Sequence, residues 1–283
     1  MKANPVTPFA IVLCAAVVAL EPARPAAADA SGEVEPALQP DTAAEPAGGE
    51  GVSPVELIPR LELRQVFTRL EGGIAVHDTV LELDIQFLRR LLLRYQSPVR
   101  VVETPMGQTS GLGDIQFGLV AILKSSPRFV AALVAGAELN SATQPALGAG
   151  KLQPILGLGA AVKPYRWLLA YAVAQQQFSV SGASNRPDTN QLATDVGSIL
   201  FGKDFNWLKL DLQTTVDFPG GAVGRLYGLA EVGSLVIGRV GLFARLGTQL
   251  AGPAYADYTV AAGFRYLFRL EAARPRPGAP GRI

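Results

Sequence analysis

The stretch Gly111–Lys124, GLGDIQFGLVAILK, alternates between polar and apolar residues. Asp114, Gln116, Gly118 and Lys124 occupy even positions, and every odd position from Ile115 to Leu123 is apolar. A period of two is typical of a β-strand with one apolar and one polar face. Because such a strand could belong to any sheet, the neighbouring segments decide what its apolar face contacts.

Similar alternating segments of roughly ten to fifteen residues recur along the chain, with turn residues between them and no convincing helix. They predict about twelve strands, an even number. The expected strands are Leu57–Arg69, Ile74–Leu88, Arg90–Val101, Gly113–Lys124, Arg128–Asn140, Lys151–Lys163, Trp167–Val180, Asn190–Lys203, Asn206–Phe218, Gly224–Gly238, Val240–Ala251 and Ala256–Leu270.

The connections between these segments alternate in length. Every second one is tight, including KSSPR, KPYR, KDFN and IGRV, whereas the others include SPVRVVETPMGQTSG, SATQPALGAGK and SGASNRPDTN. A soluble meander has no reason to alternate in this way, but an outer-membrane barrel has short periplasmic turns and long extracellular loops. The sequence therefore predicts an all-β fold, an antiparallel up-and-down transmembrane β-barrel of about 12 strands over residues 55–270.

The composition is compatible with this fold. Charged residues make up 17% of the chain and the mean hydropathy is positive, yet the only long apolar run lies at the start. Soluble domains carry about 25% charged residues, and membrane helices need runs of about 20 apolar residues. The formal net charge of +1 gives no reason to expect binding to nucleic acid.

Residues 1–30 have the pattern of a cleaved signal peptide, with Lys2, an apolar run from Phe9 to Leu20 and the cleavage motif Ala28-Asp29-Ala30. A transmembrane anchor is the alternative, but the run is too short. Cleavage would remove Cys14, the one cysteine. Residues 31–54 read as a disordered acidic linker rich in Pro, Ala and Gly, and residues 271–283 as a flexible tail. We therefore expect export to a bacterial outer membrane.

The strand period assigns one polar face to the lumen of the barrel and one apolar face to the lipid. The candidate lumen-lining residues are Arg60, Glu62, Arg64, Glu82, Asp84, Arg94, Asp114, Gln116, Glu138, Asp195, Lys209, Asp211, Glu231, Arg245 and Arg265. Aromatic residues predict girdles at the two rims. Trp167, Phe201 and Trp207 belong to the girdle at the short turns, and Phe178 and Tyr227 to the girdle at the long loops.

The last strand carries Gly263, Tyr266 and Phe268, which resemble the C-terminal signal by which the barrel-assembly machinery recognises its substrates. About fifteen residues follow Phe268, where such chains usually end. SGLGDIQFGLVAIL, PILGLGAAVKPYRWLLAYAVAQQQFS and GFRYLF resemble the outer-membrane family named for the meta-pathway of phenol degradation, over most of residues 55–270. That resemblance implies a transporter of small, often aromatic, compounds.

Residues suited to covalent chemistry are scarce. His77 is the only histidine, and a catalytic triad or a zinc site needs further partners that the pattern does not supply. The glycines of GLGD lack the strand–helix context of a phosphate-binding loop. We therefore expect no enzyme activity, no cofactor and no metal.

The expected function is passive passage of small solutes, hydrophobic or aromatic ones among them, through the barrel. The alternative is a non-conducting structural barrel whose lumen is closed by salt bridges. The lumen charges fit both hypotheses, since charges in a narrow lumen have to be paired in either case. Twelve strands lie between barrels filled by side chains and barrels with an aqueous channel.

Overall fold

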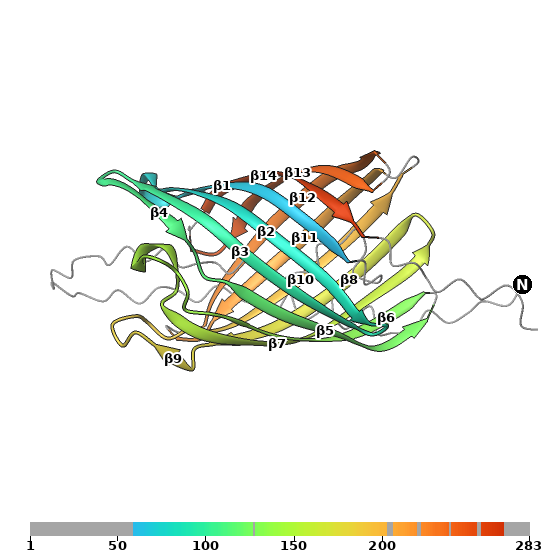
Figure 1. Ribbon diagram of the computed structural model, residues 1–283, viewed down its shortest axis with the longest axis horizontal. Coiled ribbons are helices and arrows are strands. Elements are labelled where there is room, and N and C mark those ends of the chain that lie inside the picture. The colour runs from blue at the N-terminus through green and yellow to red at the C-terminus, as the bar shows by residue number, and fades with distance from the viewer. Residues whose placement is uncertain are drawn as a thin grey trace, which may run out of the picture. The chain divides into compact units, whose positions relative to one another are not determined.

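The computed structural model describes residues 59–126, 128–202, 206–219, 222–237, 239–253 and 256–268. These residues form an antiparallel sheet in which neighbouring strands follow the order β2-β1-β14-β13-β12-β11-β10-β8-β7-β6-β5-β3-β4. An additional pairing of β2 with β3 closes the sheet into a barrel (Figure 1). Twelve strands make up its wall, so the predicted antiparallel twelve-stranded β-barrel is confirmed. The predicted signal peptide, linker and C-terminal tail lie outside the described residues.

The wall strands are β1 (Arg60–Leu70), β2 (Ala75–Leu88), β3 (Leu91–Thr104), β5 (Gln116–Ser126), β6 (Phe129–Glu138), β7 (Lys151–Tyr165), β8 (Leu168–Phe178), β10 (Asn190–Phe201), β11 (Asn206–Asp217), β12 (Val223–Ile237), β13 (Val240–Ala251) and β14 (Ala256–Leu267). Two shorter strands, β4 (Gly107–Leu112) and β9 (Ser181–Gly182), pair with β3 and β7. Short 3-10 turns cover η1 (Glu71–Gly73) and η2 (Pro145–Leu147). Within the described ranges, no helix is long and apolar enough to span a membrane.

The first and last strands of the barrel pair with each other. β1 and β14 align from Arg60 opposite Leu267 to Leu70 opposite Ala256. Beyond these pairs, the Phe268 N–H donates to the Pro59 carbonyl at 2.9 Å. This pairing leaves neither terminal strand with an open edge, which satisfies the backbone polar groups that a bilayer would otherwise leave unpaired.

The barrel has two different rims. The end of the barrel where β2, β5, β7, β10 and β12 end, and where β1 begins and β14 ends, is here called the short-turn rim. The opposite end, where β1, β6, β8, β11 and β13 end, is here called the long-loop rim, and the connections 71–74, 139–150 and 179–189 lie there. In Figure 1, β4 and β9 mark the long-loop rim on the left.

The third connection differs from the sequence prediction. SPVRVVETPMGQTSG was expected to be a long loop, but β3 continues to Thr104 and pairs with β4, from Val99 opposite Leu112 to Thr104 opposite Gly107. The predicted strand Gly113–Lys124 begins only at Gln116, because residues 113–115 form a break between β4 and β5. At the break, the Gly113 N–H donates to the Pro98 carbonyl at 2.9 Å, and Asp114 is engaged by a neighbouring loop.

Burial along the strands is the reverse of that in a soluble protein. In β11, the side chains of Lys209 and Asp211 are buried, whereas Leu210 and Leu212 are 43% and 50% exposed. The same contrast separates buried Arg245 from exposed Leu242 and Leu246 in β13. An exposed apolar face opposite a buried charged face is typical of strands that have lipid on one side and a polar lumen on the other.

Candidate functional site: the barrel lumen

Ionisable side chains gather on the inner face of eight strands, β1, β2, β3, β10, β11, β12, β13 and β14. Here they are called the lumen charge cluster. Its six basic members are Arg60, Arg64, Arg94, Lys209, Arg245 and Arg265, and its six acidic members are Glu62, Glu82, Asp84, Asp195, Asp211 and Glu231. The numbers of positive and negative charges therefore balance. All but Arg94 are buried, and the Arg94 side chain is 11% exposed.

Glu82 and Asp84 on β2 organise one half of this cluster. Glu82 accepts from Arg60 Nη2 and, at 3.0 Å, from Arg64 Nη1. Arg94 on β3 donates to both oxygens of Asp84, at 2.8 and 2.9 Å, and its Nε lies 3.4 Å from Glu82. Bidentate pairs of this kind combine charge with fixed geometry.

Glu231 on β12 organises the second half. Its carboxylate lies 2.9 Å from Arg245 Nη2 and 3.1 Å from Arg265 Nη1, and it accepts a hydrogen bond from Trp207 Nε1 at 2.8 Å. Arg265 also donates to Glu62, so one guanidinium joins the two halves. A connected network of this size keeps buried charges paired, which they require in a low-dielectric interior.

β8, β10 and β11 extend the cluster around the lumen. Lys209 Nζ lies 2.9 Å from Asp211 Oδ2 and 5.6 Å from the centre of the Tyr171 ring. The Tyr171 hydroxyl donates to Asp211. Asp195 on β10 is 2% exposed.

Apolar and aromatic side chains continue the lumen towards the short-turn rim. The buried members of this group are Ala161, Leu169, Tyr171, Ile199, Trp207 and Phe243, and Phe201 packs against them. The Arg265 guanidinium lies 4.3 Å from the centre of the Phe243 ring. The lumen therefore passes from a charged zone to an aromatic one along the same strands.

The prediction of aromatic girdles is wrong for three residues, Phe201, which packs against the buried lumen group, Trp207 and Tyr227. Trp207 is 5% exposed and points inward, because Gly233 lies opposite it on β12 and leaves room for the indole. Tyr227 also points inward and donates to Thr259 Oγ1 at 2.8 Å. By contrast, Tyr165 and Trp167 at the short-turn rim are 59% and 48% exposed, and their rings stack with 5.3 Å between centroids.

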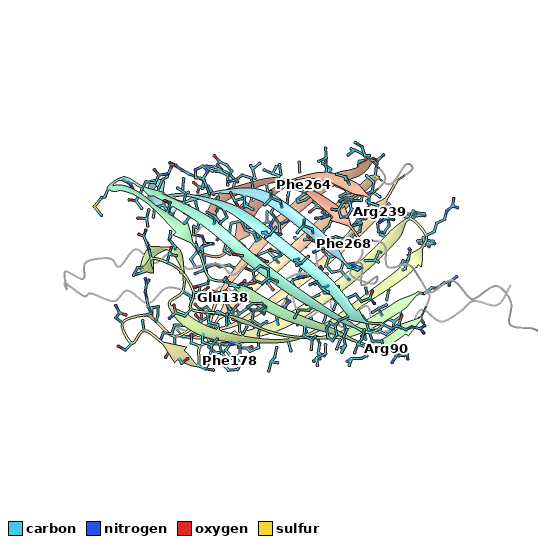
Figure 2. The ribbon with its side chains drawn as sticks, in the orientation of Figure 1. Arg90, Glu138, Phe178, Arg239, Phe264 and Phe268 are labelled. Atoms are coloured by element: carbon cyan, nitrogen blue, oxygen red, sulfur yellow. The ribbon has the colours of Figure 1, made fainter. Side chains whose placement is uncertain are left out.

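A cavity of about 450 Å³ occupies the half of the lumen near the long-loop rim. Asp114, Gln116 and Glu138 line it. Figure 2 labels Glu138 towards this end and Arg90 at the short-turn end. The neutral polar residues of the lining are Thr68, Gln96, Gln116, Thr189, Gln191, Gln213, Thr215, Tyr227, Gln249 and Thr259.

Asp114 holds the connection between β6 and β7, residues 139–150, here called the inner loop. Asp114 Oδ1 accepts the backbone N–H groups of Ser141 at 3.0 Å and Ala142 at 2.9 Å. Asp114 Oδ2 accepts the N–H of Ala149 at 2.6 Å. One carboxylate thus fixes both ends of the inner loop.

The inner loop folds towards β1, β2 and β3. Leu147 is fully buried and belongs to a cluster that includes Leu70, Val76 and Val102. Arg100 donates to the Leu147 carbonyl at 3.3 Å while it makes a bidentate pair with Asp78. The loop therefore narrows the lumen from one side.

Sequence reasoning missed Arg100 and Asp78, although both share strand parity with lumen residues on the same strands, Arg94 and Glu82. It also missed Gln153 on β7 and Gln177 on β8. Both are buried, and both occupy odd positions, as the other buried residues of these two strands do. The signal was present in the alternation, because Asp78, Gln153 and Gln177 lie within the predicted strands Ile74–Leu88, Lys151–Lys163 and Trp167–Val180. Arg100 lies where the predicted strand Arg90–Val101 overlaps the stretch expected to be a long loop.

His77 lies on the outer face of β2 near the long-loop rim. Its ring packs against Phe67 with 4.9 Å between centroids, and its Nε2 lies 3.9 Å from Glu103. In the part of the chain that the structure describes, no group of three or more His, Cys, Asp or Glu side chains is arranged to hold a metal ion.

No known family profile and no curated protein sequence matches this chain. Solved structures share its fold. An outer-membrane channel from Pseudomonas putida F1 is 13% identical, covers 75% of this chain and 94% of its own, and has a TM-score of 0.58. The NanC porin is 7% identical, with coverages of 73% and 98% and a TM-score of 0.57. The KdgM porin is 9% identical, with coverages of 74% and 99% and a TM-score of 0.53. At these identities the likeness shows a shared barrel fold.

Proposed function

We propose that this protein is a bacterial outer-membrane channel for the passive passage of small solutes, hydrophobic or aromatic ones among them. The observation that carries the proposal is the combination of an apolar outer face with a polar lumen that contains a cavity of about 450 Å³. The proteins that share the fold are named as porins and as an outer-membrane channel, which supports the same role. The mechanism is selective passage without covalent chemistry.

The aromatic end of the lumen supports passage of apolar or aromatic solutes. Trp207, Phe243 and Tyr171 gather towards the short-turn rim, next to buried Leu169 and Ile199. Aromatic faces and edges attract aromatic solutes in offset and edge-to-face arrangements. The resemblance to the phenol-pathway family points to the same class of solute.

Placement in the outer membrane implies export and assembly. We propose that residues 1–30 are removed as a signal peptide and that the barrel-assembly machinery recognises Gly263, Tyr266 and Phe268. Tyr266 and Phe268 lie at the short-turn rim, with 5.1 Å between ring centroids, and both are more than a third exposed. Such an exposed aromatic pair suits contact with lipid headgroups or with an assembly factor.

The second candidate is a non-conducting structural barrel. The observation that favours it is the lumen charge cluster, in which five arginines and four carboxylates lie in a connected network and Lys209 pairs with Asp211. Charges that are paired with each other hold the wall in register and contribute little to ion selectivity.

Single-channel recording separates the two candidates. The protein is refolded and inserted into planar bilayers, and currents are recorded in 1 M salt. The Debye length is then about 3 Å, so surface charge has little effect on the current. A channel gives discrete conductance steps, whereas a closed structural barrel gives none at any protein concentration. Heat-modifiable migration in gels, folded against boiled, verifies beforehand that the barrel has formed.

A further inference from the structure

The cavity near the long-loop rim has two chemically different walls. On β1, β2 and β14, five apolar side chains line it, Val66, Leu70, Val76, Val80 and Ala256, here called the apolar wall, and Thr68, Asp78 and Thr259 lie among them. β5, β6, β10 and β11 contribute the other wall, and β10 lies directly across the closed barrel from β2. The lining that they contribute is polar and consists of Gln116, Glu138, Gln191, Gln213, Thr215 and Asp217.

Behind the polar side runs a row of hydrogen-bonded side chains, here called the amide row, which comprises the amides of Gln116, Gln153, Gln177 and Gln191 and the carboxyl group of Glu138. Gln116, Glu138 and Gln191 line the cavity, and Gln177 Nε2 reaches Glu138 Oε2 at 3.5 Å. Gln116 Nε2 donates to Glu138 Oε2 at 2.8 Å. Gln177 Nε2 donates to Gln153 Oε1 at 2.6 Å, and Gln191 Nε2 donates to Gln177 Oε1 at 3.0 Å. These five strands are neighbours in the sheet, so the row runs around one side of the lumen.

The strand register explains why the row is continuous. Gln116 pairs with Glu138, Glu138 with Gln153, and Gln177 with Gln191 across adjacent strands. The row fixes each amide in one orientation, because every member donates to or accepts from another. A side-chain amide carries two donors and one acceptor with two lone pairs, so Gln116 and Gln191, the two amides of the row that line the cavity, still present donors and acceptors to it.

Several charges beside the cavity have protein partners. Asp78 and Arg100 form a bidentate pair at 2.8 Å on both sides, and Asp114 accepts three backbone N–H groups of the inner loop. Lys151 Nζ lies 2.6 Å from Asp188 Oδ1. A charged solute that entered this cavity would lose hydration and would have to compete with these existing pairs.

We infer that this cavity binds an uncharged hydroxylated solute, with its hydroxyl groups on the amide row and its C–H surface on the apolar wall. A hydroxyl group both donates and accepts, which matches a row of amides better than it matches carboxylates or guanidinium groups. The volume of about 450 Å³ lies in the range of small-molecule sites. This inference rests on the proposed channel function and names its class of solute. Sugars and hydroxylated aromatics share the required chemistry.

Calorimetric titration of the folded protein in detergent tests the inference without relying on conductance. The probes are glucose, catechol, gluconate and glucosamine, of which the last two add a negative and a positive charge to a sugar of similar size. We expect glucose or catechol to bind at least about tenfold more tightly than gluconate and glucosamine. If glucose binds more tightly than catechol, the solute is a sugar, and if catechol binds more tightly, it is a hydroxylated aromatic compound. Tighter binding of either charged sugar, or no binding of glucose and catechol, overturns the inference.

Two substitutions in the amide row and one matched control locate the site. Gln191→Leu and Gln116→Leu each remove a lining amide, and each should weaken binding about fivefold, the equivalent of one net hydrogen bond. Gln176→Leu alters a neighbouring glutamine on β8 that faces away from the lumen and bonds to Asn190 at the long-loop rim, and it should leave binding unchanged. Equal effects of all three substitutions would refute the amide row as the site.

The inference about the solute and the proposed channel function can be refuted separately. If conductance steps occur but neither neutral solute binds, the channel function stands and the inference about the solute is wrong. If no conductance occurs under any condition, the channel function is wrong, and the inference loses its premise whatever the calorimeter records.

Discussion

Glu62 on β1 lies directly opposite Glu82 on β2, and the same guanidinium nitrogen, Arg64 Nη1, contacts both carboxylates, at 2.9 and 3.0 Å. Both glutamates are buried. Like charges directly opposite on neighbouring strands repel each other, and burial strengthens this repulsion. Arg64 therefore makes the pairing of β1 and β2 compatible with two acidic residues at the same register.

Replacing Arg64 with Met should expose this dependence. The substitution keeps an unbranched side chain but removes the shared positive charge, so the unfolding free energy should fall by about 3–5 kcal/mol. Denaturant titration of the protein in lipid vesicles measures the change. Gln65→Met, at the next residue on the outer face, should shift the unfolding free energy by less than about 1 kcal/mol. A loss of similar size in both variants would contradict the role assigned to Arg64.

Gly233 provides a second test, because it leaves space for the Trp207 indole. A Cβ at Gly233 would lie 2.1 Å from Trp207 Cζ2, whereas a Cβ at Gly224 on the same strand would meet nothing within 4 Å. Gly233→Ala should therefore destabilise the barrel by about 1–3 kcal/mol through overpacking. The Trp207 fluorescence should shift at the same time. Gly224→Ala is the matched control and should preserve both stability and fluorescence.

Asp114→Asn should loosen the inner loop. The asparagine amide nitrogen cannot accept an N–H group, so at least one of the three backbone donors loses its partner at about 1–3 kcal/mol. We expect proteinase K to cleave within residues 139–150 roughly tenfold faster, because local opening becomes easier. Asp188→Asn, on a side chain that is 77% exposed, should not change the cleavage pattern. Unchanged cleavage of Asp114→Asn would show that other contacts hold the loop.

Much of this architecture is readable in the sequence because strand geometry has a fixed period. Lys209 and Asp211 share a parity, and Leu210 and Leu212 share the other, so one assignment of faces applies to the whole strand. The alternation of short and long connections carries the topology, since it reflects the two rims of one barrel. Neither inference needs knowledge of distant contacts.

The contacts that shape the lumen were harder to predict. Trp207 has the parity of Lys209 but was assigned to a rim girdle on the strength of its residue type, and only the glycine opposite it shows that the indole fits inside. The inner loop depends on Asp114, which lies 27 residues before Ser141 in the chain. Hydrogen bonds of this kind leave no local periodic signal, so they became visible only in three dimensions.

The lipid-facing assignment can be tested by placing a charge on it. Leu212 lies midway along β11 and is 50% exposed, and Ile237 ends β12 at the short-turn rim and is 75% exposed. Leu212→Arg should lower the free energy of unfolding in vesicles by about 2–4 kcal/mol. Ile237→Arg should lower it by only about 0–1 kcal/mol, because the cost of a lipid-facing charge falls towards the membrane interface. Equal costs at both positions would contradict a bilayer around this wall.

Phe243 allows a test of whether the aromatic end of the lumen limits passage. Its ring contacts Arg265 and lies against Gly263 of β14, so Phe243→Ala removes a large group from the path of a solute. We expect a higher single-channel conductance, together with a loss of about 3–5 kcal/mol in stability from the cavity that remains. Phe264→Ala, on the outer face of β14, should not alter the conductance. Because Phe243→Ala could impair folding, heat-modifiable migration is checked first, and Phe243→Leu serves as a milder variant. Folded Phe243 variants with wild-type conductance would place the narrowest part of the path elsewhere, at the inner loop or within the lumen charge cluster.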